Sequence, residues 1–478
     1  MAPHGSGIFQ GCLLPNIPIE LMLIRYSGSW RKPLGLDKFE FLSRTGGHEA
    51  VQDILDQENA MMRMRSMWCG VCLMVFVVLY GAAGGQEWTR FRGPDGTGIG
   101  KGESIPVSFT QADYLWKVKL PGPGHSSPVL WGDRIFLTCT HDASKQREVV
   151  CLDARSGRML WSTKMAFTPY RHNRQNSFAA STPAVDVECV YVNWISGGMF
   201  VALALDHAGN TLWRREMGEF KARHGAGASP IALGGLMIVG NDNMATSFLA
   251  GLNGRTGKTV WQIKRSSKMT SYITPAVYRP KDGDPEVVFV SEANGMTAVD
   301  PISGQKKWES DKLFTLKSVS SPVVAASVIF TTAGTGGTGR ESAAVRPGDK
   351  LTGRNPTVAW KLDRDLPYVS TPIAIGEHLY ILSDAGVMTC VVAATGKQVW
   401  QEDLDGKFYA SPVSVNGRIY LVTRSGEVIV LKAGPECKVL ARNTLSEISD
   451  ATPAIANGRM YIRTLNHLIC IGDAKAEH

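Results

Sequence analysis

The feature that most constrains the fold is a unit of four short β-strand patterns that recurs along the chain. Its most regular copy spans Ser370 to Trp400. In this copy Pro372–Ile375, His378–Leu382 and Val387–Ala393 are apolar and rich in strand-forming residues, and a fourth run follows after Gly- and Asp-containing turns. Short strands at regular spacing, separated by such turns, predict an antiparallel all-β unit.

The unit can be counted from its start and its end. It starts with a small hydroxyl residue and a proline, at positions 40 to 55 residues apart: Pro128, Pro183, Pro230, Pro275, Pro322, Pro372, Pro412 and Pro453. It ends with a tryptophan-containing run, at Trp161, Trp213, Trp261, Trp308, Trp360 and Trp400, with Leu440 in one copy. A period of this length with four strands per copy predicts the blades of a β-propeller.

The two ends of the repeat region predict how the ring closes. The copy that starts at Pro453 has only two further strand patterns, whereas a spare fourth-strand sequence, Leu115–Leu120, precedes the first copy. Trp116 lies 12 residues before Pro128, the same spacing as in later copies. We therefore expect the N-terminal strand to complete the last blade, so that residues 115–472 form a closed eight-bladed propeller without free edges. A row of β-sandwiches is the alternative architecture.

The N-terminal part differs from the repeats. Residues 1–60 carry no blade pattern, and we interpret them as an unstructured or wrongly assigned upstream extension. Residues 61–85 combine a basic start, an apolar stretch and small residues, which is typical of a secretory signal peptide. The apolar stretch is short for a membrane span, so we expect a periplasmic or extracellular protein without stable membrane insertion. If residues 1–60 are genuine, this stretch would instead act as a membrane anchor.

Two shorter segments flank the propeller region. Residues 86–114 are polar and Gly-rich, and we expect Trp88 and Phe91 to pack this lead-in segment onto the propeller. Residues 473–478 form a tail.

The net charge is +8, but Lys and Arg are scattered among acidic residues, which argues against nucleic-acid binding.

Two further sequence features could indicate a disulfide bond and a dinucleotide-binding site. Cys139 and Cys151 flank a predicted strand turn, and export would permit a disulfide between them; the alternative for Cys151 is a small buried apolar residue. Gly334–Gly339 reads G-x-G-x-x-G, but a dinucleotide site requires a helix after it. The segment that follows contains Pro and Gly, so we expect a flexible loop there instead.

The end of the repeat resembles the pyrroloquinoline-quinone-type (PQQ-like) propeller repeat. The resemblance is clear in LDARSGRMLW (152–161), LNGRTGKTVW (252–261), VDPISGQKKW (299–308) and VAATGKQVW (392–400), and it covers Leu115 to about Gly472. The lead-in WTRFRGPDGTGIG and the segment HGAGASPI are similar to secreted bacterial members whose role is unsettled. The resemblance implies that the tryptophan packs between blades and that the glycine forms the turn, which are structural roles.

Two branches of this family imply different functions. Quinoprotein dehydrogenases bind PQQ and Ca²⁺ on the propeller axis, and their alcohol-dehydrogenase members usually carry a disulfide between adjacent cysteines. This chain has no adjacent cysteines, no C-x-x-C-H haem motif and no recognisable set of Ca²⁺ ligands near the axis. The other branch is non-catalytic and includes the scaffold of the outer-membrane barrel-assembly machinery, from which this chain differs in lacking a visible lipoprotein cysteine.

One face of the propeller is the expected place for a site. It carries the connectors between blades and the turns between second and third strands, and loops on a rigid scaffold often bind ligands. The position three residues before each blade-starting proline should approach the axis. From these loops we select the candidate ligand-binding residues His125, His172, Asn176, His224, Asp242, Arg265, Tyr272, Tyr409 and Asp450.

These residues favour binding over catalysis. Arg and His donors suit a polar or anionic ligand, and an ordinary solvated loop face is the alternative. The histidines come from separate loops without metal-ligand spacing, and no nucleophile has an evident base. We therefore predict a non-catalytic binding or protein-interaction scaffold of the cell envelope, monomeric, with a protein or a polar or anionic small molecule as its partner. The alternative is a PQQ-dependent dehydrogenase that oxidises an alcohol or sugar with PQQ and Ca²⁺.

Overall fold

The computed structural model describes residues 87–102, 105–349 and 352–472, which all belong to one compact unit, Gly84–His478. The predicted extension (1–60), signal peptide (61–85) and tail (473–478) lie outside the described residues. Within the described part of the chain, no helix is both long and apolar enough to cross a membrane.

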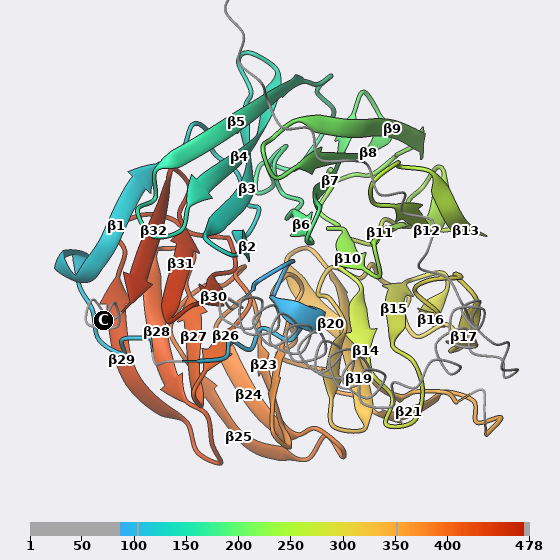
Figure 1. Cartoon of the computed structure of the whole chain (residues 1–478). Helices are drawn as coiled ribbons and strands as arrows, with labels where there is room; N and C mark the ends of the chain where they lie inside the picture. Colours follow the sequence, from blue (N-terminus) through green and yellow to red (C-terminus); the bar gives the residue numbers. More distant parts are fainter. Residues whose placement is uncertain (1–86, 103–104, 350–351, 473–478) are drawn as a thin grey trace, which may run out of the picture. The chain divides into compact units, whose positions relative to one another are not determined.

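The described residues form eight four-stranded antiparallel sheets around a central axis, as predicted (Figure 1). The first four blades follow the order of the chain. Their strands are β2 (Val129–Trp131), β3 (Arg134–His141), β4 (Gln146–Asp153) and β5 (Met159–Ala166); β6 (Ala184–Val185), β7 (Cys189–Ser196), β8 (Met199–Asp206) and β9 (Thr211–Glu219); β10 (Ile231–Leu233), β11 (Leu236–Asn241), β12 (Ser247–Asn253) and β13 (Thr259–Arg265); β14 (Ala276–Tyr278), β15 (Glu286–Ser291), β16 (Gly295–Val299) and β17 (Lys306–Glu309).

The other four blades have the same organisation. Their strands are β18 (Val323–Ala325), β19 (Val328–Thr335), β20 (Thr338–Arg346) and β21 (Thr357–Trp360); β22 (Ile373–Ile375), β23 (His378–Leu382), β24 (Val387–Val392) and β25 (Gln398–Asp403); β26 (Val413–Val415), β27 (Arg418–Val422), β28 (Glu427–Lys432) and β29 (Lys438–Thr444); β30 (Ala454–Ala456), β31 (Arg459–Arg463), β32 (His467–Gly472) and β1 (Tyr114–Lys119). Two short 3₁₀ helices, η2 (Pro94–Gly96) and η3 (Gln111–Asp113), precede β1.

The ring closes through the N-terminal strand. β1 pairs antiparallel with β32, with Trp116 opposite Cys470. The same pairing of tryptophan and cysteine joins Trp161 to Cys151 in blade 1. The prediction of closure by residues 115–120 is therefore confirmed, and the last sheet has the order β1-β32-β31-β30.

The disulfide permitted between Cys139 and Cys151 is not formed. In the β3–β4 pair Cys139 lies opposite Glu148, and Cys151 lies opposite Phe136. The two thiols belong to different interblade cores, and both cysteines are free and buried. Since alternate residues of a strand point to opposite faces of the sheet, the register keeps the two sulfurs apart. The alternative reading of Cys151, a small buried residue, is confirmed.

The repeat motif works through contacts between adjacent blades. The indole N–H of Trp213 donates to the carbonyl oxygen of Gly254 in the next blade, at 2.6 Å. The turn that receives this tryptophan needs a glycine: Gly257 has φ +69°, and a Cβ there would lie 2.6 Å from Trp213 Cδ2. The structural roles implied by the family resemblance are thus present in the geometry.

The lead-in segment contacts blades 1 and 7. Trp88 is fully buried and pairs with Leu130 of the first strand in blade 1. Farther along, the N–H of Ser414 in blade 7 donates to the carbonyl of Gly98, at 2.8 Å. Phe91 lies between these contacts and reaches a cavity on the axis. Residues at both ends of this segment are thus hydrogen-bonded to first strands of the propeller.

The G-x-G-x-x-G segment forms the turn of a β-hairpin, and the first part of the segment after it, up to Arg346, is strand and not the predicted flexible loop. Thr335 of β19 pairs with Thr338 of β20, so Gly336 and Gly337 form a two-residue turn. Both glycines have positive φ, which is the conformation that such hairpin turns need. The strand continues to Arg346, and among the described residues the next element is β21, so no helix is placed there to hold a pyrophosphate.

Candidate functional site

A cavity of about 660 Å³ lies on the propeller axis. Its volume is within the range of small-molecule sites. Connectors that enter first strands and turns that follow second strands line it, which is the face predicted from the sequence. The position three residues before each blade-starting proline lines the cavity in every blade: His125, Ala180, Gly227, Tyr272, Val319, Val369, Tyr409 and Asp450.

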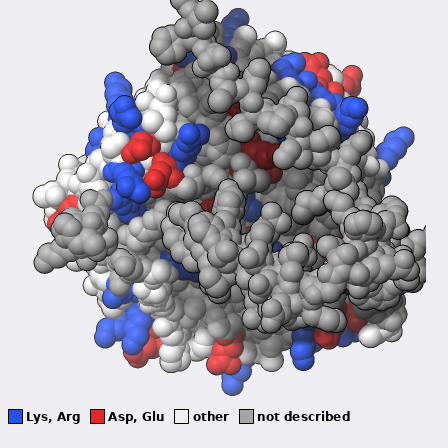
Figure 2. Space-filling view, viewed as in Figure 1, with Lys and Arg blue, Asp and Glu red and all other residues white. Residues whose placement is uncertain are grey.

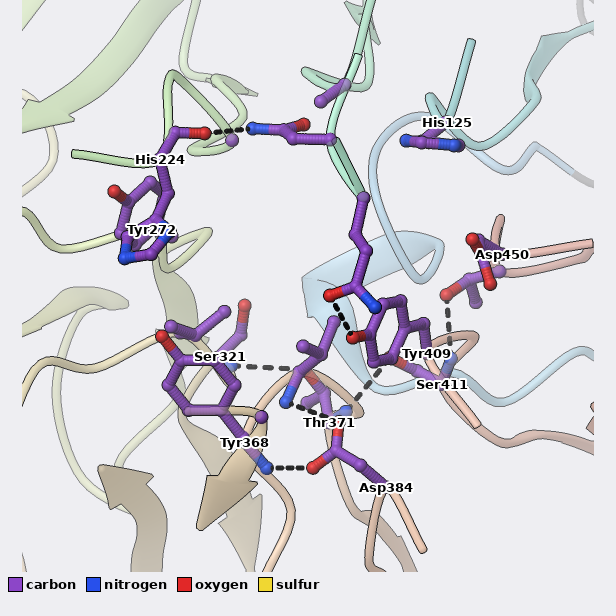
Figure 3. A pocket seen from close by; sticks show the side chains of 18 of the residues that line it. His125, His224, Tyr272, Ser321, Tyr368, Thr371, Asp384, Tyr409, Ser411 and Asp450 are labelled. Atoms are coloured by element: carbon purple, nitrogen blue, oxygen red, sulfur yellow. Dashed lines mark hydrogen bonds between the residues drawn. The ribbon is translucent and has the colours of Figure 1, made fainter. Parts of the chain in front are cut away.

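A ring of hydroxyl groups surrounds the axis one layer deeper. The residue before each proline is Ser or Thr, and at six of the eight junctions between blades its hydroxyl accepts from the N–H of the matching residue in the preceding blade. For example, the N–H of Ser321 donates to Thr371 Oγ1 at 3.1 Å, and the N–H of Thr371 donates to Ser411 Oγ at 3.0 Å (Figure 3). The hydroxyls of Thr371 and Ser411 line the cavity and are buried. The Ser/Thr-Pro signature therefore links blades to one another and forms a polar inner wall.

The structure places six of the nine candidate residues in this cavity: His125, Asn176, His224, Tyr272, Tyr409 and Asp450. Of these, Asn176 has no free hydrogen-bonding group. Its amide donates to the carbonyls of His224 and Ala226, at 2.9 and 2.8 Å, and its oxygen accepts from the N–H of Ser177. Asn176 thus fixes the connectors against each other.

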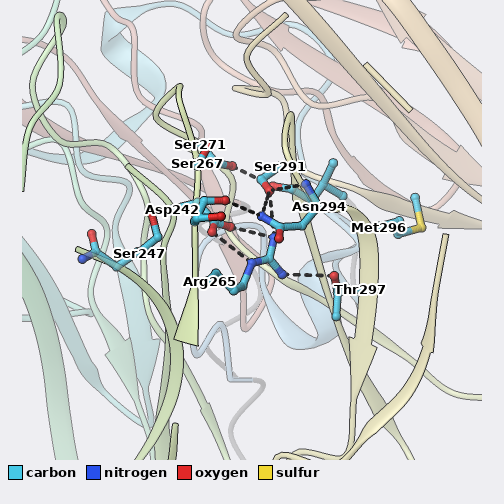
Figure 4. A network of polar contacts seen from close by, with 12 residues as sticks. Asp242, Ser247, Arg265, Ser267, Ser271, Ser291, Asn294, Met296 and Thr297 are labelled. Atoms are coloured by element: carbon cyan, nitrogen blue, oxygen red, sulfur yellow. Dashed lines mark hydrogen bonds and ion pairs between the residues drawn. The ribbon is translucent and has the colours of Figure 1, made fainter. Parts of the chain in front are cut away.

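The other three candidates, His172, Asp242 and Arg265, are not among the residues that line the cavity. The ring of His172 packs on Phe178, with 4.2 Å between ring centroids. Asp242 and Arg265 form a buried ion pair in blade 3 (Figure 4), with 2.9 Å between Arg265 Nε and Asp242 Oδ1. The same guanidinium also donates to Thr297 of the next blade. Both charges are satisfied inside the protein, so they link blades 3 and 4.

One side of the cavity carries an ion pair next to an aromatic ring. Arg424 makes two parallel hydrogen bonds to Asp450, at 2.8 and 3.1 Å. Its guanidinium carbon lies 3.9 Å from the centre of the Tyr409 ring. The Tyr409 hydroxyl donates to Gln175 Oε1 at 2.9 Å, which ties the connector between blades 1 and 2 to blade 7 (Figure 3). This group is rigid because each member is held by another.

Asp384 is the second carboxylate of the cavity. It accepts hydrogen bonds from the backbone N–H groups of Tyr368 and Val369. Burial raises the pKa of Asp384 to about 6, and these two N–H groups oppose the increase. The carboxylate is therefore largely ionised at neutral pH, and it lines the cavity.

His125 lies on the opposite wall from Tyr368, near Asp450 (Figure 3). Burial lowers the pKa of His125; the charge of Asp450 raises it, and Arg463 and Arg424 lower it further. At neutral pH the imidazole is therefore neutral and presents one donor and one acceptor nitrogen.

Several lining residues were not among the candidates: Asn173, Gln175, Tyr368, Asp384, Lys407 and Arg424. They lie in the same connectors and turns that the sequence marks as the functional face. Which side chain of a loop points to the axis depends on the loop conformation, and the repeat gives no signal for it. The position next to each repeat start is the exception, because the strand register fixes its direction.

The fold and the repeat contacts define a PQQ-like β-propeller. The sequence profile of the family described as outer membrane protein assembly factor BamB matches residues 103–347, 351–436 and 383–477, more than half of the chain. The chain belongs to this family. No curated protein in the comparison matches it.

Solved structures of both branches share the fold. BamB from Moraxella catarrhalis is 15% identical, with a TM-score of 0.54 over 76% of this chain and 98% of that chain. A europium-containing methanol dehydrogenase is 12% identical, with a TM-score of 0.60 over 81% and 98%. Quinohemoprotein alcohol dehydrogenase from Comamonas testosteroni is 12% identical, with a TM-score of 0.56 over 81% of each chain. At these identities the likeness shows the fold alone.

The cavity residues do not fit the cofactor set of the dehydrogenase branch. Ca²⁺ takes six to eight oxygen ligands, with several carboxylates among them. The cavity has two carboxylates, and Asp450 is already paired with Arg424 while Asp384 accepts from backbone N–H groups. Among the residues that the structure describes, no group of three or more His, Cys, Asp and Glu side chains is arranged to hold a metal ion.

Proposed function

We propose that this protein is an exported, non-catalytic binding protein of the cell envelope, and that it holds a small polar ligand in the axial cavity. The observation that supports this proposal is the cavity of about 660 Å³ lined by polar groups from all blades. Phe91 of the lead-in segment and the buried hydroxyl residues Thr371 and Ser411 are part of the same lining. A concave site with a few fixed polar groups is the usual form of a small-molecule site.

Free hydrogen-bonding groups face this space. The ring nitrogens of His125, the amide nitrogen of Gln175 and the ammonium of Lys407 line the cavity and have no partner among the described residues. Tyr272 and Tyr368 add aromatic surface on the wall across from His125 (Figure 3). Burial raises the pKa of Tyr272 to about 12, so its hydroxyl stays protonated. Such a lining suits a ligand with hydroxyl groups and an apolar face.

A protein partner on the same face is the second candidate function. Ile448 and Leu465 are exposed there, at 56% and 37%, and the N–H of Leu465 donates to the carbonyl of Ile448 at 2.9 Å. Adjacent exposed aliphatic residues favour contact with another protein. The family profile, which is named for an outer membrane protein assembly factor, supports the same direction.

Saturation-transfer NMR on the full chain tests the cavity directly. The probes are neutral sugars, polyols, amino acids and small carboxylic acids, measured on the natural protein and on Val319→Trp. Val319 lines the cavity, so the larger side chain fills it. Val187→Trp is the matched control, because Val187 is 72% exposed in the turn between β6 and β7.

We expect some probes to bind the natural protein and the Val187→Trp control but not Val319→Trp. Probes that bind all three equally would contradict the proposal.

A parallel titration with PQQ and Ca²⁺ tests the alternative function. A saturable rise of the melting temperature that needs both PQQ and Ca²⁺ would favour a dehydrogenase, because a ligand selective for the native state stabilises it. For export, N-terminal sequencing of the secreted protein should start near Gln86.

A further inference from the structure

Three basic residues belong to connectors at one side of the cavity: Arg223 and His224 precede blade 3, and Lys317 precedes blade 5. His224 lines the cavity, and Figure 3 shows it on the same side as Tyr272 and Tyr368. The Lys317 ammonium lies 5.7 Å from the centre of the Tyr368 ring. Three connectors, those entering blades 3, 5 and 6, thus bring basic and aromatic side chains to one wall.

The charges of this group are not neutralised within the described structure. Neither Arg223 nor Lys317 forms an ion pair with a carboxylate of the described residues, whereas Arg424 on the other side is paired with Asp450. Burial lowers the pKa of His224, and the charges of Lys317 and Arg223 lower it further. Burial also lowers the pKa of Lys317, and Arg223 adds to this effect. Because Lys317 is partly buried, the repulsion that it experiences from the charge of Arg223 is unfavourable, and a bound anion would relieve this repulsion.

The opposite side of the cavity has complementary chemistry. There Asp450 lies near His125 and is paired with Arg424, and the hydroxyls of Thr371 and Ser411 line the cavity. Asp384, which lies beside Tyr368 and accepts from its N–H, adds a second carboxylate to the lining. A ligand that spans the cavity therefore meets cations at one end and hydrogen-bond acceptors at the other. Hydroxyl groups can donate to the carboxylates, and a carboxylate group can accept from the cations.

We propose that Arg223, His224 and Lys317 form a subsite for the anionic group of the ligand, and that the ligand is a small hydroxyl-rich carboxylate of the acidic-sugar class. This inference rests on the proposed function, because it assigns the ligand class of the same cavity. The proposed subsite differs from a general polar site because it requires the ligand to carry a negative charge next to these basic residues.

The test follows the imidazole of His224 by NMR in the full chain labelled at histidine, with a His224→Asn variant to assign the signal. The probes are galacturonate and galactose, which differ by the carboxylate. Galacturonate should raise the measured pKa of His224 by about one pH unit, because an anion nearby favours the charged imidazole, and galactose should not. Lys317→Gln should weaken galacturonate binding roughly tenfold, as expected for the loss of one charged hydrogen bond.

The matched control is Lys397→Gln, since Lys397 lies in the turn between β24 and β25, outside the cavity lining. It should leave both galacturonate affinity and the His224 signal unchanged. Equal responses to galacturonate and galactose would overturn the anionic subsite and leave the proposed function standing. No response to either sugar would also overturn this ligand class, while the Val319→Trp comparison decides the proposed function separately.

Discussion

Aspartates that follow the second strand of their blades have different roles because their surroundings differ. Asp242 follows β11 and points to Arg265 of β13, where the pair is buried. Asp384 comes shortly after β23, accepts from two backbone N–H groups and lines the cavity. Burial raises the pKa of both carboxyls. The partner within reach, and not the position in the repeat, thus decides whether a carboxylate is available to a ligand.

The buried pair of blade 3 leads to a prediction at this scale. Asp242→Asn should lower the free energy of unfolding by about 3 kcal/mol, because Arg265 then remains buried without its counter-ion. Asp133→Asn is the control, since Asp133 pairs with Arg155 at 3.2 Å on the surface, where both side chains are more than half exposed. That change should cost no more than about 1 kcal/mol. Denaturant titrations that give equal losses for the two variants would refute a structural role for the buried pair.

The same contrast explains which residues of the site could be predicted. His125, Tyr272, Tyr409 and Asp450 occupy the position fixed by the repeat start, and the strand register directs them to the axis. His172 lies in an irregular connector, where packing on Phe178 turns its ring away. The sequence does not specify such connector conformations, because they depend on contacts between blades that are distant along the chain.

At the scale of the element, the blade is built from a turn and a tryptophan that belong to neighbouring repeats. The glycine of one turn contacts the tryptophan of the preceding blade at Gly157, Gly209, Gly257, Gly304 and Gly396. Since each of these glycines has a positive φ and no room for a Cβ, the motif stabilises the interface between blades as well as the turn.

This interpretation predicts different costs for two glycine substitutions with nearly the same φ. Gly257→Ala introduces a Cβ 2.6 Å from Trp213, whereas Gly417→Ala meets nothing within 4 Å; their φ angles are +69° and +68°. Gly257→Ala should therefore be more destabilising than Gly417→Ala by about 1–3 kcal/mol, the usual cost of overpacking. Thermal unfolding of both variants measures the difference, and equal melting temperatures would show that only the backbone conformation matters.

Strand positions were predictable because the repeat fixes them. The predicted run His378–Leu382 is strand β23, and the predicted run at Leu115–Leu120 corresponds to β1 (Tyr114–Lys119). The extent of strand β20 (Thr338–Arg346) was not predicted, because the segment after Gly339 contains Pro and Gly and was interpreted as a loop. There the antiparallel pairing of β19 with β20 gives the strand its stability, and local propensity does not.

At the scale of the whole molecule, closure of the ring joins residues from the two ends of the propeller. Glu447 lies before the last blade and contacts Lys117 of β1 at 2.8 Å. It also accepts from the Thr464 hydroxyl at 2.6 Å and contacts His467 Nδ1 at 2.9 Å. Partial burial raises the pKa of Glu447, but the hydrogen bonds from Lys117, Thr464 and His467 outweigh it and bring the pKa to about 2.

The pKa of Glu447 gives a pH-dependent prediction. Because the folded-state pKa lies below the ordinary value of 4.5, Glu447 stabilises the fold above pH 4.5, and this contribution is lost as the pH falls towards 2. Glu447→Gln should therefore lower the melting temperature at pH 6 and have a smaller effect at pH 3.5. Glu436→Gln, in a surface turn outside this cluster, is the control. A difference that grows as the pH falls would contradict the assignment.

The central claim concerns the axis of the propeller, where connectors of all blades meet around one cavity. A crystallographic screen with small polar fragments tests it most directly, because it locates each bound molecule without assuming its identity. We predict that bound fragments concentrate in the axial cavity, in contact with His125, Asp384 or Tyr368. Fragments that bind only at other places on the surface, with none on the axis, would contradict the account.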